Sequence, residues 1–212
     1  DELTEANEST GLLVPPGSVV TDTPIRKTRS LASTLERRGF MTTLTERRLG
    51  PGDGPRHDEP RLALVGVDNP ETRRQLSTSG FDLIVDAGLG AGPSHYLDIQ
   101  LHTFPADRTS DMVASWRTPK RTDFDLLRLP AYQDLISATG DECGAVEIAG
   151  RTVAASFVGA VAGALVVAEV TRSLRGEHRY SVVDATLRDL GRIDAVEVAQ
   201  PALPNLGFAT LR

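Results

Sequence analysis

The chain has 212 residues, of which 40% are hydrophobic and 25% charged, and its formal net charge is -6. This length and composition suffice for one buried core, so we expect a single α/β domain over residues 1–212. The negative charge argues against a general nucleic-acid-binding protein, because phosphate binding needs a concentrated basic surface. The single cysteine, Cys143, excludes an internal disulfide and a four-cysteine zinc site, and favours a cytoplasmic protein.

The N-terminal part of the chain predicts a helix, a strand and a loop. Residues 24–39 have proline in the first turn, apolar residues at Leu31 and Leu35, and a terminal glycine, which is typical of a helix. Residues 40–46 mix threonines with apolar residues and predict a strand. Residues 50–60, GPGDGPRHDEP, predict a flexible loop because of their glycine and proline content.

The segment RLALVGVDNPETRRQLSTSGFDLIVDAGLGAG, residues 61–92, predicts two buried strands joined by a helix. Its apolar runs are continuous, which is typical of strands covered on both faces. Pro70 would lie in the first turn of the helix, and Leu83–Val85 would form the second strand. Asp68 would then follow the first strand at its carboxyl end, where ligands bind in open α/β sheets. The expected fold is a Rossmann-like, mostly parallel sheet flanked by helices, with added antiparallel strands.

The C-terminal half predicts further helices and strands. Residues 96–104 alternate apolar and polar side chains, as a half-exposed, antiparallel or edge strand does. Residues 153–170 are rich in small apolar side chains and include Glu169, so a buried helix is favoured over a membrane span. Arg172, Arg175 and Gly176 would end this helix. Short helices are expected at 126–129 and 131–138, and a closing hairpin at 180–187 and 193–199.

Asp68, Asn69 and Arg73 are the first candidate site. A carboxylate at a strand end can bind Mg²⁺ beside nucleotide phosphates or accept a ribose hydroxyl, and Arg73 is one helical turn away and can reach a phosphate. Alternatively, Asp68 or Asn69 is only the N-cap of the helix that starts at Pro70. Spacing alone favours the cap, and the two roles can coexist.

Three other features are weaker signals. The glycines of GLGAG, residues 88–92, resemble a dinucleotide-binding fingerprint, but Pro93 stands where the third glycine is required, so we interpret them as a turn whose glycines could let a ligand approach the backbone closely. Lys27, with Arg26 and Arg29, lies near a helix N-terminus and could meet phosphate, although most such charges are solvated. Cys143 is interpreted as an incidental cysteine rather than a nucleophile.

Four segments in order resemble the ThiF/MoeB/HesA family, the bacterial relatives of ubiquitin-activating enzymes. They are DELTEAN at 1–7, IRKTR at 25–29, VDNPETRR at 67–74 and the long apolar helix that ends in a basic residue and glycine at 153–176. Members of this family use ATP to adenylate the C-terminal carboxylate of a small ubiquitin-like or sulfur-carrier protein.

The resemblance implies a role for each matching residue. Asp1 would lie at the ribose of ATP, Asn7 and Lys27 would contact its phosphates, and Asp68 would bind Mg²⁺ at the α- and β-phosphates. These groups would meet in one pocket, where a carboxylate oxygen attacks the α-phosphorus and pyrophosphate leaves. Positioning and charge neutralisation suffice for such a reaction. A ubiquitin-like or sulfur-carrier protein or peptide is the implied partner.

The chain also departs from the family pattern. The family's first strand and glycine-rich loop would precede Asp1, Thr10 replaces an arginine, and the paired zinc-binding cysteines are missing. One hypothesis is therefore the C-terminal part of an adenylyltransferase, working as a homodimer or as a heterodimer with a chain that supplies the glycine-rich loop. The other is a non-catalytic partner-binding or dimerisation subunit. A nicotinamide-dependent oxidoreductase is disfavoured by Pro93, and neither nucleic acid nor a membrane is expected as a partner.

Overall fold

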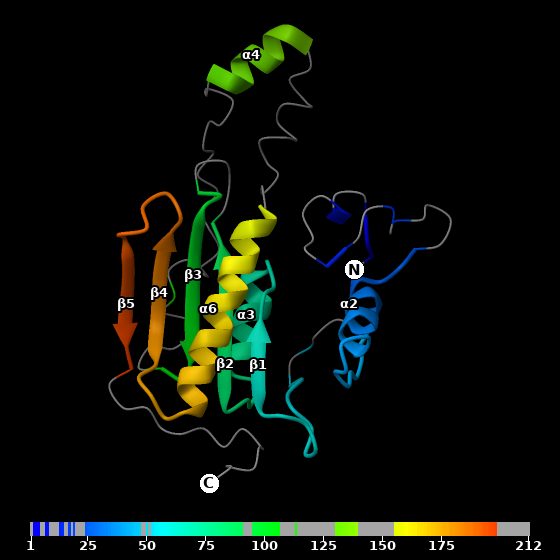
Figure 1. The fold of residues 1–212 in the computed structure, drawn as a ribbon, viewed down its shortest axis with the longest axis vertical. Helices are drawn as coiled ribbons and strands as arrows, with labels where there is room; N and C mark the ends of the chain where they lie inside the picture. The colour runs from blue at the N-terminus through cyan, green and yellow to red at the C-terminus, as the bar shows by residue number, and fades with distance from the viewer. Residues whose placement is uncertain are drawn as a thin grey trace.

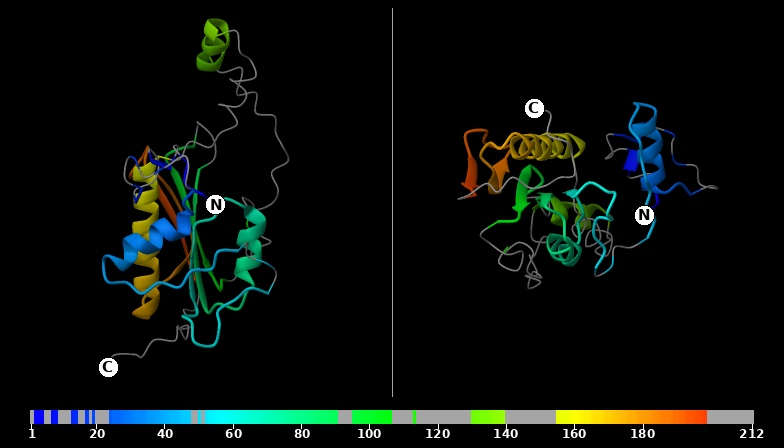
Figure 2. Two further views of the ribbon diagram at one scale, coloured as in Figure 1. Left: turned by 90° about the vertical axis from the view of Figure 1, so that its right-hand side faces the viewer. Right: turned by 90° about the horizontal axis from the view of Figure 1, so that it is seen from below.

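A computed structural model describes residues 2–4, 7–8, 13–14, 17, 19, 24–47, 50, 52–90, 95–106, 113, 130–139 and 155–198. A sheet of five strands in the order β1-β2-β3-β4-β5 carries helices on both faces (Figures 1 and 2). The elements are β1 (Leu62–Val65), β2 (Leu83–Leu89), β3 (Asp98–Phe104), β4 (Tyr180–Thr186), β5 (Ile193–Glu197), α2 (Lys27–Glu36), α3 (Pro70–Ser77), α4 (Pro130–Thr139) and α6 (Ser156–Leu174).

The sheet is mixed rather than mostly parallel. The α/β class, the flanking helices and the added antiparallel strands are confirmed, but only β1 and β2 run parallel, joined by α3. The other three pairs of neighbouring strands are antiparallel. The connection between β2 and β3 is short, and a parallel crossover needs a dozen or more residues, so the chain turns back on itself there.

The main core lies between the sheet and α6. One face of the sheet meets one side of this helix, and α3 covers the opposite face (Figure 2). The buried side chains of this core are Leu83, Val85, Ile99, Leu101 and Val183 from the strands and Val158, Ala162, Val166 and Val170 from the helix. By length and composition α6 would also suffice to cross a membrane, but in this structure its inner side packs against the sheet, as predicted for residues 153–170.

The C-terminal end of α6 combines a glycine cap with a buried carboxylate. Gly176 has φ of 68°, and the N–H of Glu177 donates to the carbonyl of Arg172 at 2.9 Å, which confirms the predicted glycine end. Glu169, only 1% exposed, pairs with Arg172 and accepts the backbone N–H of Tyr180 at 2.9 Å. The charge inside the apolar run is thus accommodated by an arginine of the same helix and by a backbone N–H at the start of β4.

Predictions for the other elements have mixed outcomes. The helix at 24–39 is present as α2, and the closing hairpin is present as β4 and β5. The strand predicted at 40–46 is not formed: these residues are irregular, and Met41 is fully exposed. A strand is stable only when its backbone pairs with that of a neighbouring strand. This segment is held through a side chain, because the Glu46 carboxylate binds Arg29 at 2.8 Å. Helix α4 corresponds to 131–138, whereas 126–129 and Cys143 lie outside the described residues.

Candidate functional site

Asn69 is the N-cap of α3. Its side-chain oxygen accepts the backbone N–H groups of Glu71 at 2.9 Å and Thr72 at 3.2 Å, and Pro70 follows in the first turn. These bonds satisfy backbone donors that a helix start would otherwise leave without partners. Of the two residues that the sequence offered as caps, Asn69 takes the role, and the carboxylate of Asp68 is not used for it.

Asp68 is exposed beside this cap, three residues beyond the end of β1. Within the described part of the chain its carboxylate forms no hydrogen bond or ion pair, and no group of three acidic, histidine or cysteine side chains could hold a metal ion. Mg²⁺ is commonly held by one or two carboxylates together with substrate phosphates and water. A single free carboxylate at a strand end fits that mode, and does not fit a site built from protein ligands alone.

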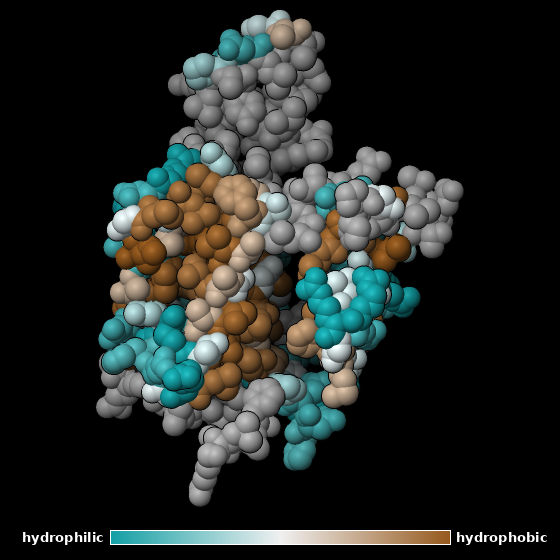
Figure 3. Space-filling view, viewed as in Figure 1, coloured by the Kyte–Doolittle hydropathy of each residue, from teal (hydrophilic) through white to brown (hydrophobic). Residues whose placement is uncertain are grey.

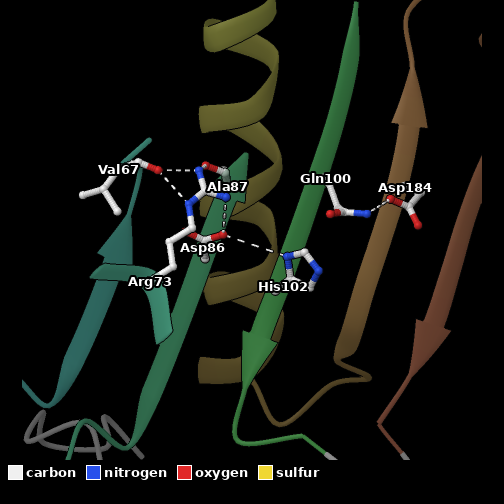
Figure 4. Close-up of polar contacts among 7 residues, drawn as sticks. All are labelled: Val67, Arg73, Asp86, Ala87, Gln100, His102 and Asp184. Carbon is white, nitrogen blue, oxygen red and sulfur yellow. Dashed lines mark hydrogen bonds and ion pairs between the residues drawn. The ribbon is translucent and has the colours of Figure 1, made fainter. Parts of the chain in front are cut away.

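Arg73 turns away from solvent and joins the ends of β1 and β2 (Figure 4). Its Nε donates to the carbonyl of Val67 at 2.7 Å, and Nη2 donates to the same oxygen. Nη1 donates to Asp86 at 3.1 Å, and Nη2 reaches the carbonyl of Ala87 at 3.3 Å. The phosphate contact predicted for Arg73 would therefore require this guanidinium to leave several internal partners.

Asp86 and His102 form the buried polar centre behind Arg73. Asp86 is 1% exposed, and its Oδ1 has no hydrogen-bond partner in the part of the chain that the structure describes. Burial raises the pKa of Asp86 to about 7, against the opposing effect of Arg73. His102 Nδ1 lies 3.9 Å from Asp86 Oδ2, and burial lowers the pKa of His102 to about 4, with Asp184 raising it and Arg73 lowering it further. The polar Asp86 within the apolar run LIVDA is the signal in the sequence for this centre, whereas His102 takes an ordinary polar position in the alternating pattern of 96–104.

Asp86→Asn should change how stability depends on pH. In the folded protein the pKa of Asp86 is about 7, against an ordinary value of 3.8. The stabilising contribution of the protonated carboxyl is therefore full below pH 3.8 and is lost as pH rises through 7. Relative to wild type, the free energy of unfolding of the variant should rise by up to about 1.4 kcal/mol per pH unit from pH 5 to 7.

Urea denaturation of both proteins from pH 5 to 8 measures this difference. His102 has the opposite dependence, because its lowered pKa gives stability above 6.5 that is lost as pH falls through 4. It is present in both proteins, so its contribution cancels in the difference. A difference that stays constant from pH 5 to 8 would contradict the prediction.

The glycines at 88–90 shape this region instead of forming a dinucleotide loop. Gly88 lies in β2, and a Cβ there would come 2.7 Å from Nη1 of Arg73. The turn begins at Gly90, whose N–H donates to the carbonyl of Asp98 at 2.8 Å and whose Cβ would fall 1.8 Å from the carbonyl oxygen of His95. Gly88 thus allows a close approach by a side chain of this chain, while 91 and 92 lie outside the described residues.

Asn7 and Lys27 belong to a second local unit. Asn7 accepts the backbone N–H of Thr4 at 2.9 Å, and the N–H of Leu3 donates to the carbonyl of Ile25 at 2.8 Å, so this segment lies against the start of α2. Lys27 is the exposed first residue of that helix. The unit lies on the β1 side of the sheet (Figure 1). Asp1 and Thr10 are outside the described residues, so the pocket shared with Asp68 stays a prediction.

Comparison with known proteins identifies the family. A model of the BilD C-terminal domain family matches residues 1–177, which include the strand end, the cap and α6. The chain belongs to the BilD C-terminal domain family. A relative named "Bacterial E1-like protein BilD", from Collimonas sp. (strain OK412), is 39% identical over 193 residues, which are 90% of this chain and 41% of the relative. This agrees with the E1-like character that the motifs predicted.

This chain spans less than half the length of that BilD relative. No solved structure matches this chain significantly. The activity and partners of a complete BilD-like protein therefore enter only as proposals.

Proposed function

We propose that this chain is the C-terminal part of an ATP-dependent adenylyltransferase that activates the C-terminal carboxylate of a ubiquitin-like or sulfur-carrier protein or peptide. The observation that carries the proposal is the Asp68 carboxylate, which is exposed at the end of β1 while Asn69 performs the capping. Similarity to an E1-like protein supports it.

In this proposal each residue has a limited task. Asp68 holds Mg²⁺ through its carboxylate, Asn7 and Lys27 contact the phosphates of ATP, and Asp1 binds the ribose. The bound metal would supply charge neutralisation at the α- and β-phosphates. The chain needs no nucleophile of its own, because the carboxylate of the partner attacks the α-phosphorus and pyrophosphate leaves.

The open edge of the described sheet at β1 supports the addition of a strand from another polypeptide segment. Among the described strands β1 pairs only with β2, and Leu64 on β1 is 56% exposed. An edge strand offers unpaired backbone groups to another strand. We propose that the strand and glycine-rich loop missing from these residues add on this side, from an upstream part of the same polypeptide or from a dimer partner.

Pyrophosphate exchange by the complete protein tests this function. Exchange should require Mg²⁺ and a cognate C-terminal peptide, and Asp68→Ala should lower its rate about 100-fold or more, as the loss of a group that stabilises the transition state does. Asp58→Ala, which removes the same charge from an exposed turn, is the matched control. Unchanged exchange in Asp68→Ala would show that the site assignment is wrong.

The alternative function is a non-catalytic partner-binding or dimerisation subunit. A specific observation favours it, because the outward side of α6 is apolar (Figure 3), with Phe157 55%, Val161 36% and Val167 59% exposed. Contiguous exposed apolar surface commonly marks a protein interface. Calorimetry of Mg·ATP with this chain alone separates the two functions: tight binding would count against the non-catalytic alternative.

A further inference from the structure

The guanidinium of Arg73 connects two strand ends that the sequence places about twenty residues apart. On one side, Nε and Nη2 both donate to the carbonyl of Val67, the residue immediately before Asp68. On the other side, the same group meets the Asp86 carboxylate at 3.1 Å and the Ala87 carbonyl at 3.3 Å. Only 13% of the Arg73 side chain is exposed, so these bonds are largely shielded from water.

The strand β2 is built to receive this group. Gly88 provides the space, because a Cβ there would lie 2.7 Å from Nη1 and 3.5 Å from the central guanidinium carbon. Asp86, 1% exposed, provides the carboxylate that accompanies the charge. The motif at 67–74 and the first glycine of the motif at 88–92, which are separate in the sequence, therefore meet in one unit of structure together with Asp86.

This unit holds both neighbours of Asp68. The carbonyl of Val67 is fixed by Arg73, and the side chain of Asn69 is fixed by the first N–H groups of α3. The backbone of Asp68 thus lies between an anchored carbonyl group and an anchored side chain, while within the described residues its carboxylate remains free. Fixing the backbone on each side restricts the directions in which the carboxylate can point.

We propose that Arg73 is a positioning residue for Asp68, acting through the Val67 carbonyl, and that Gly88 is required because it admits the guanidinium. The proposal rests on the proposed function for the role of Asp68 in metal binding. A planar guanidinium can serve several acceptors at fixed angles, whereas an ammonium cannot reproduce that fork. Arg73→Lys therefore keeps the charge beside Asp86 but loses the paired bonds to Val67.

The main test compares Arg73→Lys and Gly88→Ala with matched controls. Arg74→Lys changes the neighbouring arginine, which pairs with Glu71 on the surface, and Gly163→Ala adds a methyl group in open space on α6. In the complete protein, Arg73→Lys and Gly88→Ala should lower pyrophosphate exchange about 10- to 100-fold, chiefly through a higher KM for Mg·ATP, as losses of groups that orient metal ligands do. The controls should match wild type.

Amide hydrogen exchange provides a readout that does not depend on activity. In Arg73→Lys and Gly88→Ala, the amides of Glu71 and Thr72, which donate to the Asn69 side chain, should exchange about tenfold faster or more, with unchanged protection in β3 and α6. Normal protection of these two amides together with normal exchange of pyrophosphate would overturn the proposal. If wild type and Asp68→Ala differ in activity but Arg73→Lys matches wild type, the positioning role fails and the proposed function stands.

The opposite outcome is equally distinct. Faster exchange of the Glu71 and Thr72 amides in Arg73→Lys, in a protein whose wild type shows no pyrophosphate exchange, would overturn the proposed function and support the restraint of Asp68 by Arg73. Since Arg73→Lys keeps a positive charge at this position and introduces no steric clash, it is the variant to use if Gly88→Ala fails to fold.

Discussion

Replacing Glu169 by alanine should lower the free energy of unfolding by about 3–5 kcal/mol, as removal of one partner from a buried ion pair does. The carboxylate is 1% exposed, pairs with Arg172 and accepts the N–H of Tyr180. Burial lowers the pKa of Arg179, which is 2% exposed, and the charge of Glu169 opposes this lowering. Among the described residues, Nε and Nη1 of Arg179 have no hydrogen-bond partner, so Glu169 is the charge that compensates this guanidinium there.

Urea denaturation at pH 7 measures this effect. Glu177→Ala is the matched control, because Glu177 is a half-exposed glutamate that pairs with Arg175 just beyond the same helix. Exposed ion pairs contribute little, so the control should change the free energy of unfolding by less than about 1 kcal/mol. Equal effects of the two substitutions would mean that Glu169 is not the charge on which the buried Arg179 depends.

Leu101→Ala should cost about 3 kcal/mol of stability. Leu101 is 1% exposed at the centre of β3, within the cluster that joins the sheet to α6. Truncation removes apolar contacts and leaves a cavity that the neighbouring strands cannot close, because they are held in register on both sides.

The control for this truncation is Leu190→Ala, since Leu190 is 76% exposed beyond β4 and should change stability by no more than about 0.5 kcal/mol. Thermal and urea unfolding of both variants provide the comparison. A loss below about 1 kcal/mol for Leu101→Ala would contradict the assignment of this residue to the main core.

Local patterns were sufficient where an element depends on its own residues. The continuous apolar run at 62–65 and Pro70 predicted β1 and α3, and Gly176 predicted the end of α6. Patterning also predicted that 153–170 would be buried on one side. The strand predicted at the threonine-rich segment 40–46 was wrong. β-Propensity reflects packing against neighbouring strands, and the described structure places no strand beside this segment.

The candidate site shows the same division. A short polar residue before Pro70 was enough to predict a helix cap, but the choice between Asp68 and Asn69 depended on which side chain reaches the N–H groups of the first turn. The inward direction of Arg73 was not predictable from its spacing. This direction depends on acceptors on β2. The chain forms β2 beside β1 only after it has passed through α3.

The sequence by itself determined the α/β class, the strand end that carries Asp68, the start of a capped helix at Pro70 and the apolar helix that covers the sheet, because each depends on residues close together in the chain. Tertiary structure alone decided the antiparallel majority of the sheet, the burial of Asp86, and the meeting of Arg73 with Gly88. These depend on which strands become neighbours. Pairing β1 with β2 brings their carboxyl ends together and turns two separate motifs into one polar unit behind Asp68.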